Sequence, residues 1–301
     1  MRSEVERPTR RAVLISGLLG VVAALGLVGC GGSAVAPRPS PVQHGAISVD
    51  GQSRGYRVFR PPALGSRPAP LVVFLHGCFP GANGEGAGSA LHFDQQASSA
   101  GFVAVYPDGV NGCWNAGRCC GTADDIGFIR ALLDRLVKEL PIDRSRIFVT
   151  GGSGGAAMAY RLACELSSRI TAIASVAGGS SLDIPCRPAR PVSVLEMHGT
   201  EDSRLPYAGG GDLNVSPILA VVQRWVELDG CVGSPALTQI GMTKSSIWDR
   251  CKAGTIVRLD TVVGGRHSWF GCSVPPCDPV PGEPDATAVV WSFFNGLRQT
   301  A

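Results

Sequence analysis

Histidine is scarce in this sequence, and no two cysteines have the Cys-x-x-Cys spacing. The 301 residues include only five histidines and eleven cysteines. Protein sites for zinc need several Cys or His ligands, commonly at such short spacings. We therefore expect no metal centre. The sequence also lacks a P-loop lysine and an early Gly-x-Gly-x-x-Gly motif, so it predicts no other cofactor.

An excess of charge of one sign is absent as well. The chain has 27 Lys and Arg against 24 Asp and Glu, and residues 1–29 hold four Arg and two Glu of these. Without that segment, 23 basic residues stand against 22 acidic ones. Proteins that bind nucleic acid usually carry a basic patch or stripe, so we expect no nucleic-acid partner.

The N-terminal segment, residues 1–29, has the pattern of a signal peptide. A charged flank precedes an apolar run over residues 12–29, which is slightly too short for a typical membrane-spanning helix. Thr9-Arg10-Arg11 also loosely resembles a twin-arginine signal, which leaves the export route open between the two bacterial systems.

The sequence LVGC, which ends at Cys30, resembles the bacterial lipoprotein box, in which the cysteine is acylated. An ordinary signal peptide with a chance cysteine is the alternative. We expect lipid on Cys30, followed by a flexible Gly/Ser/Pro-rich tether over residues 30–43. The protein would then lie outside the cell, with this anchor as its sole membrane contact.

The remaining chain, residues 44–301, shows neither an internal repeat nor a second linker. Short apolar runs alternate with helical patterns, which predicts one α/β domain with a mostly parallel sheet covered on both faces. A hairpin around Asp50-Gly51 comes first. The other expected strands are LVVFL, FVAVY, RIFVT, ITAIASV, PVSVLEM and TIVRLDTVV, and the expected helices cover residues 93–100, 124–139, 156–165, 217–228 and 285–297.

Ser153 lies in the pattern Gly-x-Ser-x-Gly, between an expected strand and an expected helix. A serine becomes a strong nucleophile only when it is exposed, fixed and next to a base. A tight strand-to-helix turn provides this exposure, and Gly151 and Gly155 tolerate its close backbone contacts. The sequence therefore predicts that Ser153 is a nucleophile, rather than part of a phosphate-binding turn.

The base and the acid should follow the serine in the order acid, then histidine. Of the two later histidines, we expect His198 to end a strand and shape a loop, and His267 to be the base. Asp202 is the preferred acid, because it lies just beyond the strand that ends near His198. Glu201 and Asp183 are the alternatives.

An oxyanion hole needs two backbone N–H groups near the developing charge. One is expected from Gly154, which follows the nucleophile. The second is expected from the loop after the LVVFLHG strand, at Cys78. A disulfide at Cys78 would fix that loop.

Without Cys30, ten cysteines remain, an even number that suits disulfides in an exported protein. Their spacing alone does not define the pairs.

Several motifs in order resemble secreted serine esterases grouped as poly(3-hydroxybutyrate) depolymerases and feruloyl esterases. The motifs are LVVFLHGC, DDIGFIRALLDRL, GGSGGAAMAYRLAC, HGTED followed by PY, and GGRHSW. The resemblance extends over about residues 46–298. It implies an α/β-hydrolase fold with Ser153, Asp202 and His267 as the catalytic triad. Gly152 and Phe270 depart from the family pattern, which puts substrate choice in doubt more than the triad.

The same resemblance implies disulfides between Cys164 and Cys186 and between Cys231 and Cys251. Cys272 and Cys277 are close enough to close a small loop beside His267. The adjacent Cys119 and Cys120 are expected to bond outward to different partners, Cys78 and Cys113.

These features predict a serine esterase that forms an acyl-enzyme. Trp114 and Trp269 are candidate stacking faces for an aryl or sugar group, or else packing residues. Because no polymer-binding module follows His267, we expect small or oligomeric esters, either hydroxyalkanoate oligomers or feruloyl and acetyl esters of carbohydrate. A cell-envelope acyltransferase with the same triad is the main alternative, and a non-catalytic surface-binding protein is a weaker one. The sequence does not indicate the oligomeric state.

Overall fold

The computed structural model describes residues 40–117, 120–272 and 277–299. The predicted signal peptide, Cys30 and most of the predicted tether lie outside these residues. Residues 39–301 form one compact unit. No helix in the described ranges has the length and apolar character needed to cross a membrane.

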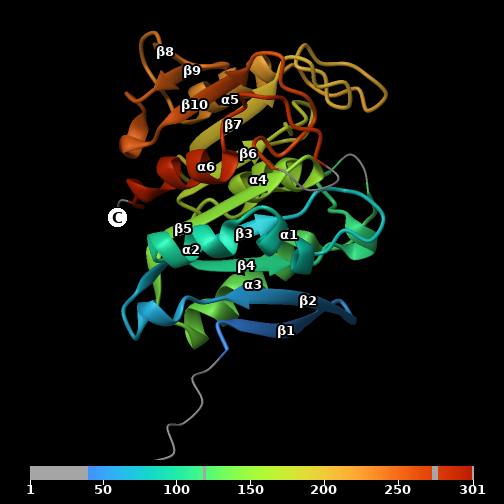
Figure 1. Ribbon diagram of the computed structural model, residues 1–301, viewed down its shortest axis with the longest axis vertical. Coiled ribbons are helices and arrows are strands. Elements are labelled where there is room, and N and C mark those ends of the chain that lie inside the picture. Colours follow the sequence, from blue (N-terminus) through green and yellow to red (C-terminus); the bar gives the residue numbers. More distant parts are fainter. Residues whose placement is uncertain (1–39, 118–119, 273–276, 300–301) are drawn as a thin grey trace, which may run out of the picture. The chain divides into compact units, whose positions relative to one another are not determined.

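The described residues form a ten-stranded sheet (Figure 1). Its central strands pair in parallel from β4 to β10, while both ends of the sheet are antiparallel. In spatial order the strands are β1 (Val42–Val49), β2 (Gln52–Phe59), β4 (Val103–Pro107), β3 (Ala69–Leu75), β5 (Ile142–Gly152), β6 (Ala172–Val176), β7 (Ser193–Gly199), β10 (Val257–Val262), β9 (Thr243–Trp248) and β8 (Ala236–Ile240).

Burial of the central strands explains their sequences. Every residue of β3, β4, β6 and β7 is buried. A strand covered on both faces has no solvent side, so it needs a continuous apolar run rather than an alternating one. The fold predicted from these runs, a mostly parallel α/β sheet, is confirmed.

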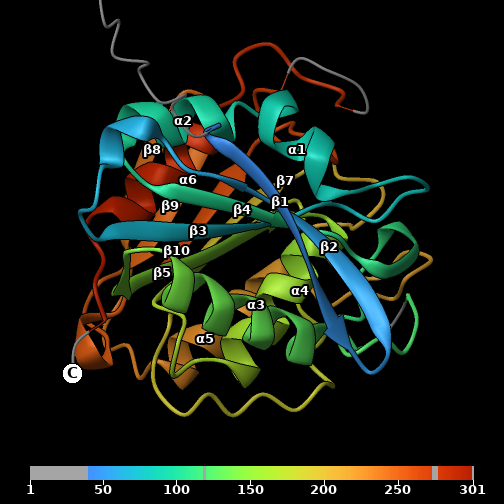
Figure 2. The same cartoon turned by 90° about the horizontal axis from the view of Figure 1, so that it is seen from below.

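Helices cover both faces of this sheet (Figure 2). In the described part of the chain, α3, α4 and α5 lie on one face, and α1, α2 and α6 lie on the other. Their bounds are α1 (Gly84–Ala90), α2 (Phe93–Ala100), α3 (Asp125–Glu139), α4 (Gly154–Glu165), α5 (Ile218–Leu228) and α6 (Ala286–Asn295), with 3-10 helices η1 (Pro62–Leu64), η2 (Val110–Gly112) and η3 (Lys252–Gly254).

The N-terminal hairpin has the turn expected from its sequence. Val49 pairs with Gln52, and Asp50 and Gly51 between them have φ values of 48° and 76°. Two consecutive positive φ values define the tight turn that suits a twisted hairpin, and Asp-Gly is a preferred pair for it. The predicted antiparallel hairpin is confirmed.

Three elements were not expected from the sequence. Helix α1 has the sequence GEGAGSA, which has little helix propensity. Its glycines allow close packing instead, since a Cβ on Gly84 would lie 2.3 Å from the carbonyl oxygen of Tyr106. Strand β8 is exposed at all five residues, and β9 is only partly buried. An edge hairpin of this kind has no apolar pattern, so its formation depends on pairing with β10.

Candidate active site

Ser153 occupies the turn between β5 and α4, with φ of 54° and ψ of −119°. Positive φ is costly for a residue with a side chain, so the neighbouring packing must enforce it. A Cβ at Gly155 would lie 2.1 Å from the carbonyl oxygen of Leu75, and one at Gly151 would lie 2.6 Å from the same atom. The flanking glycines therefore let the turn press against β3.

His267, in the loop after β10, lies between Ser153 and Asp202. Its Nε2 is 3.0 Å from Oγ of Ser153, and its Nδ1 is 2.8 Å from Oδ2 of Asp202. An Nδ1–H that donates to the carboxylate leaves Nε2 free to accept the serine proton. This is the arrangement that activates a hydroxyl as a nucleophile.

Asp202 follows β7 and is buried, with 4% of its surface exposed. Its Oδ1 accepts the backbone N–H groups of Arg204 at 2.9 Å and Leu205 at 2.7 Å. Burial alone raises the pKa of Asp202, but hydrogen bonds from His198, His267 and Leu205 outweigh it and hold this pKa well below its usual range. Asp202 is therefore a carboxylate at neutral pH.

The two alternative acids lie at the surface. Glu201 is exposed, and Asp183 is exposed and accepts a hydrogen bond from Ser181 Oγ at 2.6 Å. Of the candidates, the structure places Asp202 at the histidine.

The two expected oxyanion donors lie next to each other and close to Ser153. Gly154 is the first residue of α4, and Cys78 follows the end of β3. A Cβ built on Gly154 would lie 3.5 Å from the backbone nitrogen of Cys78, so the two backbones are neighbours. Cys78, Ser153 and Gly154 line one cavity, and two N–H groups beside the serine suit an oxyanion.

Cys78 and Cys113 are disulfide-bonded to each other. The expected bonds from Cys119 and Cys120 to these two residues are therefore wrong, because both sulfurs are already used. Cys120 is disulfide-bonded, and Cys119 lies outside the described residues. The structure also contains the pairs Cys164–Cys186, Cys231–Cys251 and Cys272–Cys277.

The described residues contain one cysteine cluster with the spacing of a metal site, formed by Cys78, Cys113 and Cys120. All three sulfurs are in disulfides. A metal-binding cysteine must be a thiolate, so this cluster does not suit a metal ion.

Trp114 is wholly buried and donates its indole N–H to the carbonyl oxygen of His76 at 2.9 Å. A buried ring has no face for a substrate, so Trp114 is a packing residue, and its expected role as a stacking face is corrected. Trp269 is 7% exposed and donates to Thr287 Oγ1 at 3.1 Å. It forms part of a cavity wall rather than a free stacking platform.

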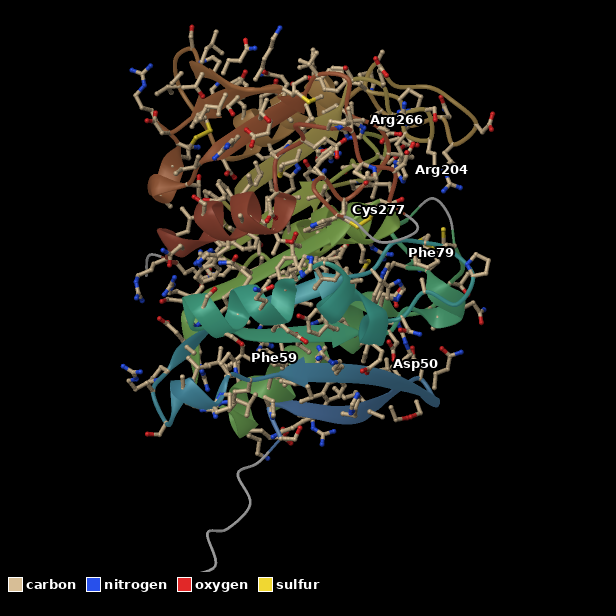
Figure 3. All side chains as sticks on the ribbon, in the orientation of Figure 1. Asp50, Phe59, Phe79, Arg204, Arg266 and Cys277 are labelled. Atoms are coloured by element: carbon tan, nitrogen blue, oxygen red, sulfur yellow. A yellow bond between two sulfur atoms is a disulfide. The ribbon has the colours of Figure 1, made fainter. Side chains whose placement is uncertain are left out.

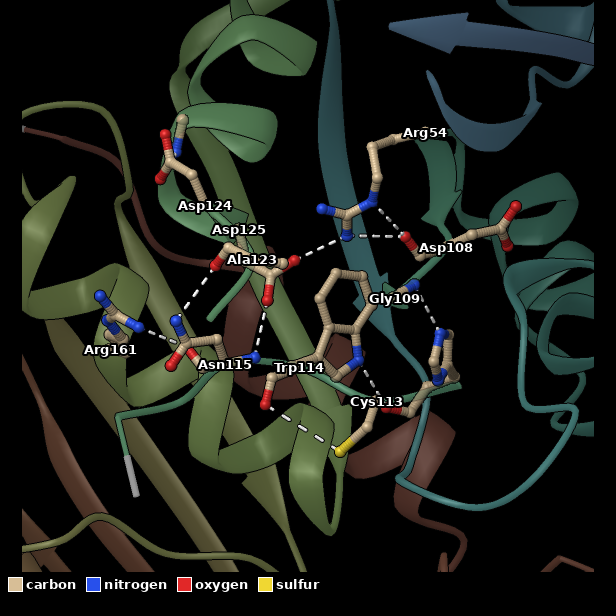
Figure 4. A network of polar contacts seen from close by, with 12 residues as sticks. Arg54, Asp108, Gly109, Cys113, Trp114, Asn115, Ala123, Asp124, Asp125 and Arg161 are labelled. Carbon is tan, nitrogen blue, oxygen red and sulfur yellow. Dashed lines mark hydrogen bonds and ion pairs between the residues drawn. The ribbon is translucent and has the colours of Figure 1, made fainter. Parts of the chain in front are cut away.

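A buried polar network supports the loop that carries Cys78 (Figure 4). His76 Nε2 accepts the Gly109 N–H at 2.9 Å, so this nitrogen is unprotonated and Nδ1 donates to the Gly77 carbonyl at 2.8 Å. Burial lowers the pKa of His76, which favours the same neutral ring. This histidine therefore joins β3 to the loop after β4.

Behind this loop, Arg54 contacts Asp125 Oδ1 at 2.6 Å and the Asp108 carbonyl at 2.9 Å (Figure 4). The other oxygen of Asp125 accepts the Asn115 N–H at 2.6 Å, and Arg161 donates to the Asn115 carbonyl. Their burial and pairing fix the segment around Cys113. Sequence reasoning missed this network because its members occupy separate strands, loops and helices.

Two cavities meet at Ser153 and His267, with Cys78 and Arg204 in the walls of both. The larger, about 590 Å³, is also mostly apolar at its surface but carries the polar side chains of Arg161, Glu165, Ser180, Ser181 and Asp212. The smaller, about 370 Å³, has an apolar wall that includes Phe79, Leu91, Val176 and Trp269. Figure 3 shows Phe79, Arg204 and Cys277 together on the loop side of the sheet.

Comparison with known proteins gives matches over the same region. The family model described as esterase PHB depolymerase matches residues 54–241. The chain is 31% identical over 219 residues to feruloyl esterase B of Piromyces equi, covering 68% of this chain but 40% of that protein. It is 27% identical over 295 residues to feruloyl esterase C of Emericella nidulans, covering 94% of this chain and 98% of that one.

Among solved structures, the acetyl xylan esterase from Aspergillus awamori is similar, with a TM-score of 0.61 and 16% identity. The match covers 84% of this chain and 99% of that one. At this identity the likeness shows a shared fold.

Proposed function

The chain belongs to the family described as esterase PHB depolymerase, and from this premise we propose that it is a serine hydrolase of carboxylic esters. The observation that carries the proposal is the continuous hydrogen-bond chain from Ser153 through His267 to Asp202. The feruloyl and acetylxylan esterases among its relatives support the same reaction class.

In the proposed mechanism, His267 Nε2 takes the proton of Ser153 as Oγ attacks the ester carbonyl. Asp202 accepts the Nδ1–H throughout, which stabilises the imidazolium that forms. His267 then passes the proton to the leaving alcohol oxygen as the acyl-enzyme forms. A water molecule repeats the sequence, so the acid is released and Ser153 regains its proton.

The backbone N–H groups of Cys78 and Gly154 would bind the carbonyl oxygen as it gains negative charge. Loss of one such donor typically lowers kcat by about 10²- to 10³-fold. Gly154 is fixed by the start of α4, and Cys78 by its disulfide to Cys113.

Both cavities are mostly apolar, but aromatic rings line only the smaller one and most of the charged side chains lie in the larger one, which supports a substrate with two unlike ends. We assign an apolar acyl group to the smaller cavity and a hydroxyl-rich alcohol to the larger one, whose serine and charged side chains can hydrogen-bond to it. An acyl ester of a carbohydrate fits this division. The family description favours hydroxyalkanoate oligomers as the second candidate.

The disulfides support a secreted protein, because such bonds persist in oxidising compartments. We further propose that lipid on Cys30 holds it at the outer surface of a membrane, through a short tether.

Activity on a panel of acetyl, butyryl, 3-hydroxybutyryl and feruloyl esters tests this function. The enzyme should hydrolyse at least one of them, and Ser153→Ala should lower kcat by at least about 10³-fold with the fold retained. Product analysis with added sugar would separate hydrolysis from acyl transfer. Equal esterase activity of the wild type and Ser153→Ala would overturn the proposal.

A further inference from the structure

A chain of buried polar side chains continues from Asp202 into the core. His198 and Glu196, both on β7, are fully buried. His198 Nε2 lies 3.4 Å from Asp202 Oδ2, and its Nδ1 lies 3.0 Å from Glu196 Oε1. The hydroxyl of Tyr160, on α4, donates to Glu196 Oε2 at 2.8 Å. The triad acid therefore contacts a second, internal histidine.

The partners of His198 indicate its protonation. Nε2 faces two acceptors, Asp202 Oδ2 and the Leu205 carbonyl oxygen at 2.8 Å, so this nitrogen carries hydrogen. Nδ1 faces a carboxylate oxygen of Glu196, whose second oxygen already has a donor in Tyr160. Both ring nitrogens can therefore donate, which is the pattern of an imidazolium.

Electrostatics agree with this geometry. Burial by itself lowers the pKa of His198, but hydrogen bonds to Asp202, Glu196 and Leu205 raise it to about 9. At neutral pH the ring is then positively charged between two carboxylates.

The other titratable groups near His198 do not compete with these two carboxylates. Tyr207 lies edge-on to its ring at a centroid distance of 6.0 Å and is hydrogen-bonded to Thr261 at 2.8 Å. On the neighbouring β10, Arg258 and Asp260 pair with each other at 2.7 Å. Their registers place them beside Leu195 and Met197, on the opposite face of the sheet from His198.

We propose that His198 is a positioning residue for the triad: a buried cation that fixes Asp202 at Oδ2, the oxygen that also contacts His267, and offsets its charge. This role rests on the hydrolysis proposed above. It gives an alternating row of Glu196 carboxylate, His198 imidazolium, Asp202 carboxylate and His267. When His267 takes the serine proton, the row becomes electrically neutral.

Loss of the charge on His198 should make the triad more strongly anionic. His267 would then stay protonated up to a higher pH, and the neutral imidazole needed for attack would form only at that higher pH. The acid limb of kcat/KM should therefore move to higher pH, by roughly one pH unit for a neighbouring partly buried charge.

The test compares pH profiles of kcat/KM for the wild type, His198→Gln and Glu196→Gln. Glutamine at 198 retains donors but no charge, and Glu196→Gln removes one of the two carboxylates that hold His198 protonated. His198→Gln should move the acid limb upward, Glu196→Gln should move it upward by less than His198→Gln does or not at all, and the double variant should move it no further than His198→Gln alone. The exposed pair His44–Glu85, at 2.7 Å, supplies the control His44→Gln, whose acid limb should not move.

Nitrogen NMR of histidine-labelled wild-type protein provides a test that needs neither activity nor a folded variant. At pH 7.5, His198 should show two protonated ring nitrogens, and a neutral ring would overturn the inference. A wild type that hydrolyses no ester would instead refute the proposed function. Ester hydrolysis with an unmoved acid limb in folded His198→Gln would refute the role of His198 alone.

Discussion

Single residues explain how Ser153 is held in the turn between β5 and α4. The strained φ of Ser153 persists because the turn is held against β3, and only glycine at 151 and 155 permits that approach. Sequence reasoning could reach this conclusion because the motif lies in a continuous stretch with a clear strand before it. Asp202 and His267 could be chosen from chain order and strand ends.

Glu196 and Tyr160 could not be found in that way. Glu196 lies within an apolar strand and Tyr160 within an apolar helix face, where polar atoms carry no local signal. Their pairing depends on how α4 packs on β7, which the sequence pattern does not define. The sequence also left two roles open for Trp114, a stacking face or a packing residue, and its full burial decides for packing.

A buried carboxyl makes the stability of the protein depend on pH. Asp229 is fully buried, with Oδ1 accepting the Val192 N–H at 3.1 Å. Burial raises the pKa of Asp229 to about 7, although hydrogen bonds from Val192 and Thr255 partly oppose this. An unfolded Asp has a pKa near 3.9. The native state thus retains a proton that the unfolded chain releases, and the free energy of unfolding falls as pH rises from about 4 to about 7.

Asp229→Asn should remove this dependence and raise the free energy of unfolding above pH 7 by roughly 1–3 kcal/mol. Urea unfolding at pH 4 and pH 8 measures it. The exposed Asp212→Asn is the control and should leave both values unchanged. Parallel pH curves for Asp229→Asn and the wild type would contradict the assignment.

At the level of elements, loops after the parallel strands supply the site. Ser153 follows β5, Asp202 follows β7, His267 follows β10 and Cys78 follows β3. Ligand sites in parallel sheets collect at this edge, which is why the convergence of Ser153, Asp202 and His267 was predictable from strand ends. Helix α1 and the β8–β9 hairpin could not be predicted from the sequence, because contacts with other elements define them.

The Cys78–Cys113 disulfide should matter more for catalysis than a disulfide elsewhere. Replacing both cysteines with alanine frees the loop that carries one oxyanion donor, so kcat should fall by about 10²-fold with a smaller change in KM. The double variant Cys231→Ala/Cys251→Ala is the control, since that pair is absent from the walls of both cavities. It should lose about 2–4 kcal/mol of stability and keep its kcat. Equal losses of kcat in the two double variants would show that the Cys78–Cys113 disulfide has no special role in catalysis.

On the scale of the whole molecule, two apolar cores on opposite faces of one sheet hold the site rigid. Phe128, Tyr160 and Trp225 belong to one core, and Phe148 and Phe294 to the other. The alternation of apolar runs and helical patterns was enough to predict this architecture. The two cavities at Ser153 could not be predicted in this way, since side chains of many separate segments line them.

Attachment at Cys30 is testable on the full chain in a bacterial host that acylates lipoproteins. The wild type should incorporate labelled fatty acid and partition into detergent, whereas Cys30→Ser should do neither and keep its activity per molecule. Unchanged detergent partitioning of Cys30→Ser would contradict lipid attachment at that residue.

The most direct test of the account is to locate a fluorophosphonate adduct by mass spectrometry, because this reagent phosphonylates an activated serine. We predict one adduct, on Ser153, which Ser153→Ala abolishes and His267→Ala greatly slows. Failure of the folded wild type to react at Ser153, or equally fast labelling in folded His267→Ala, would contradict the claim that this hydroxyl is an activated nucleophile.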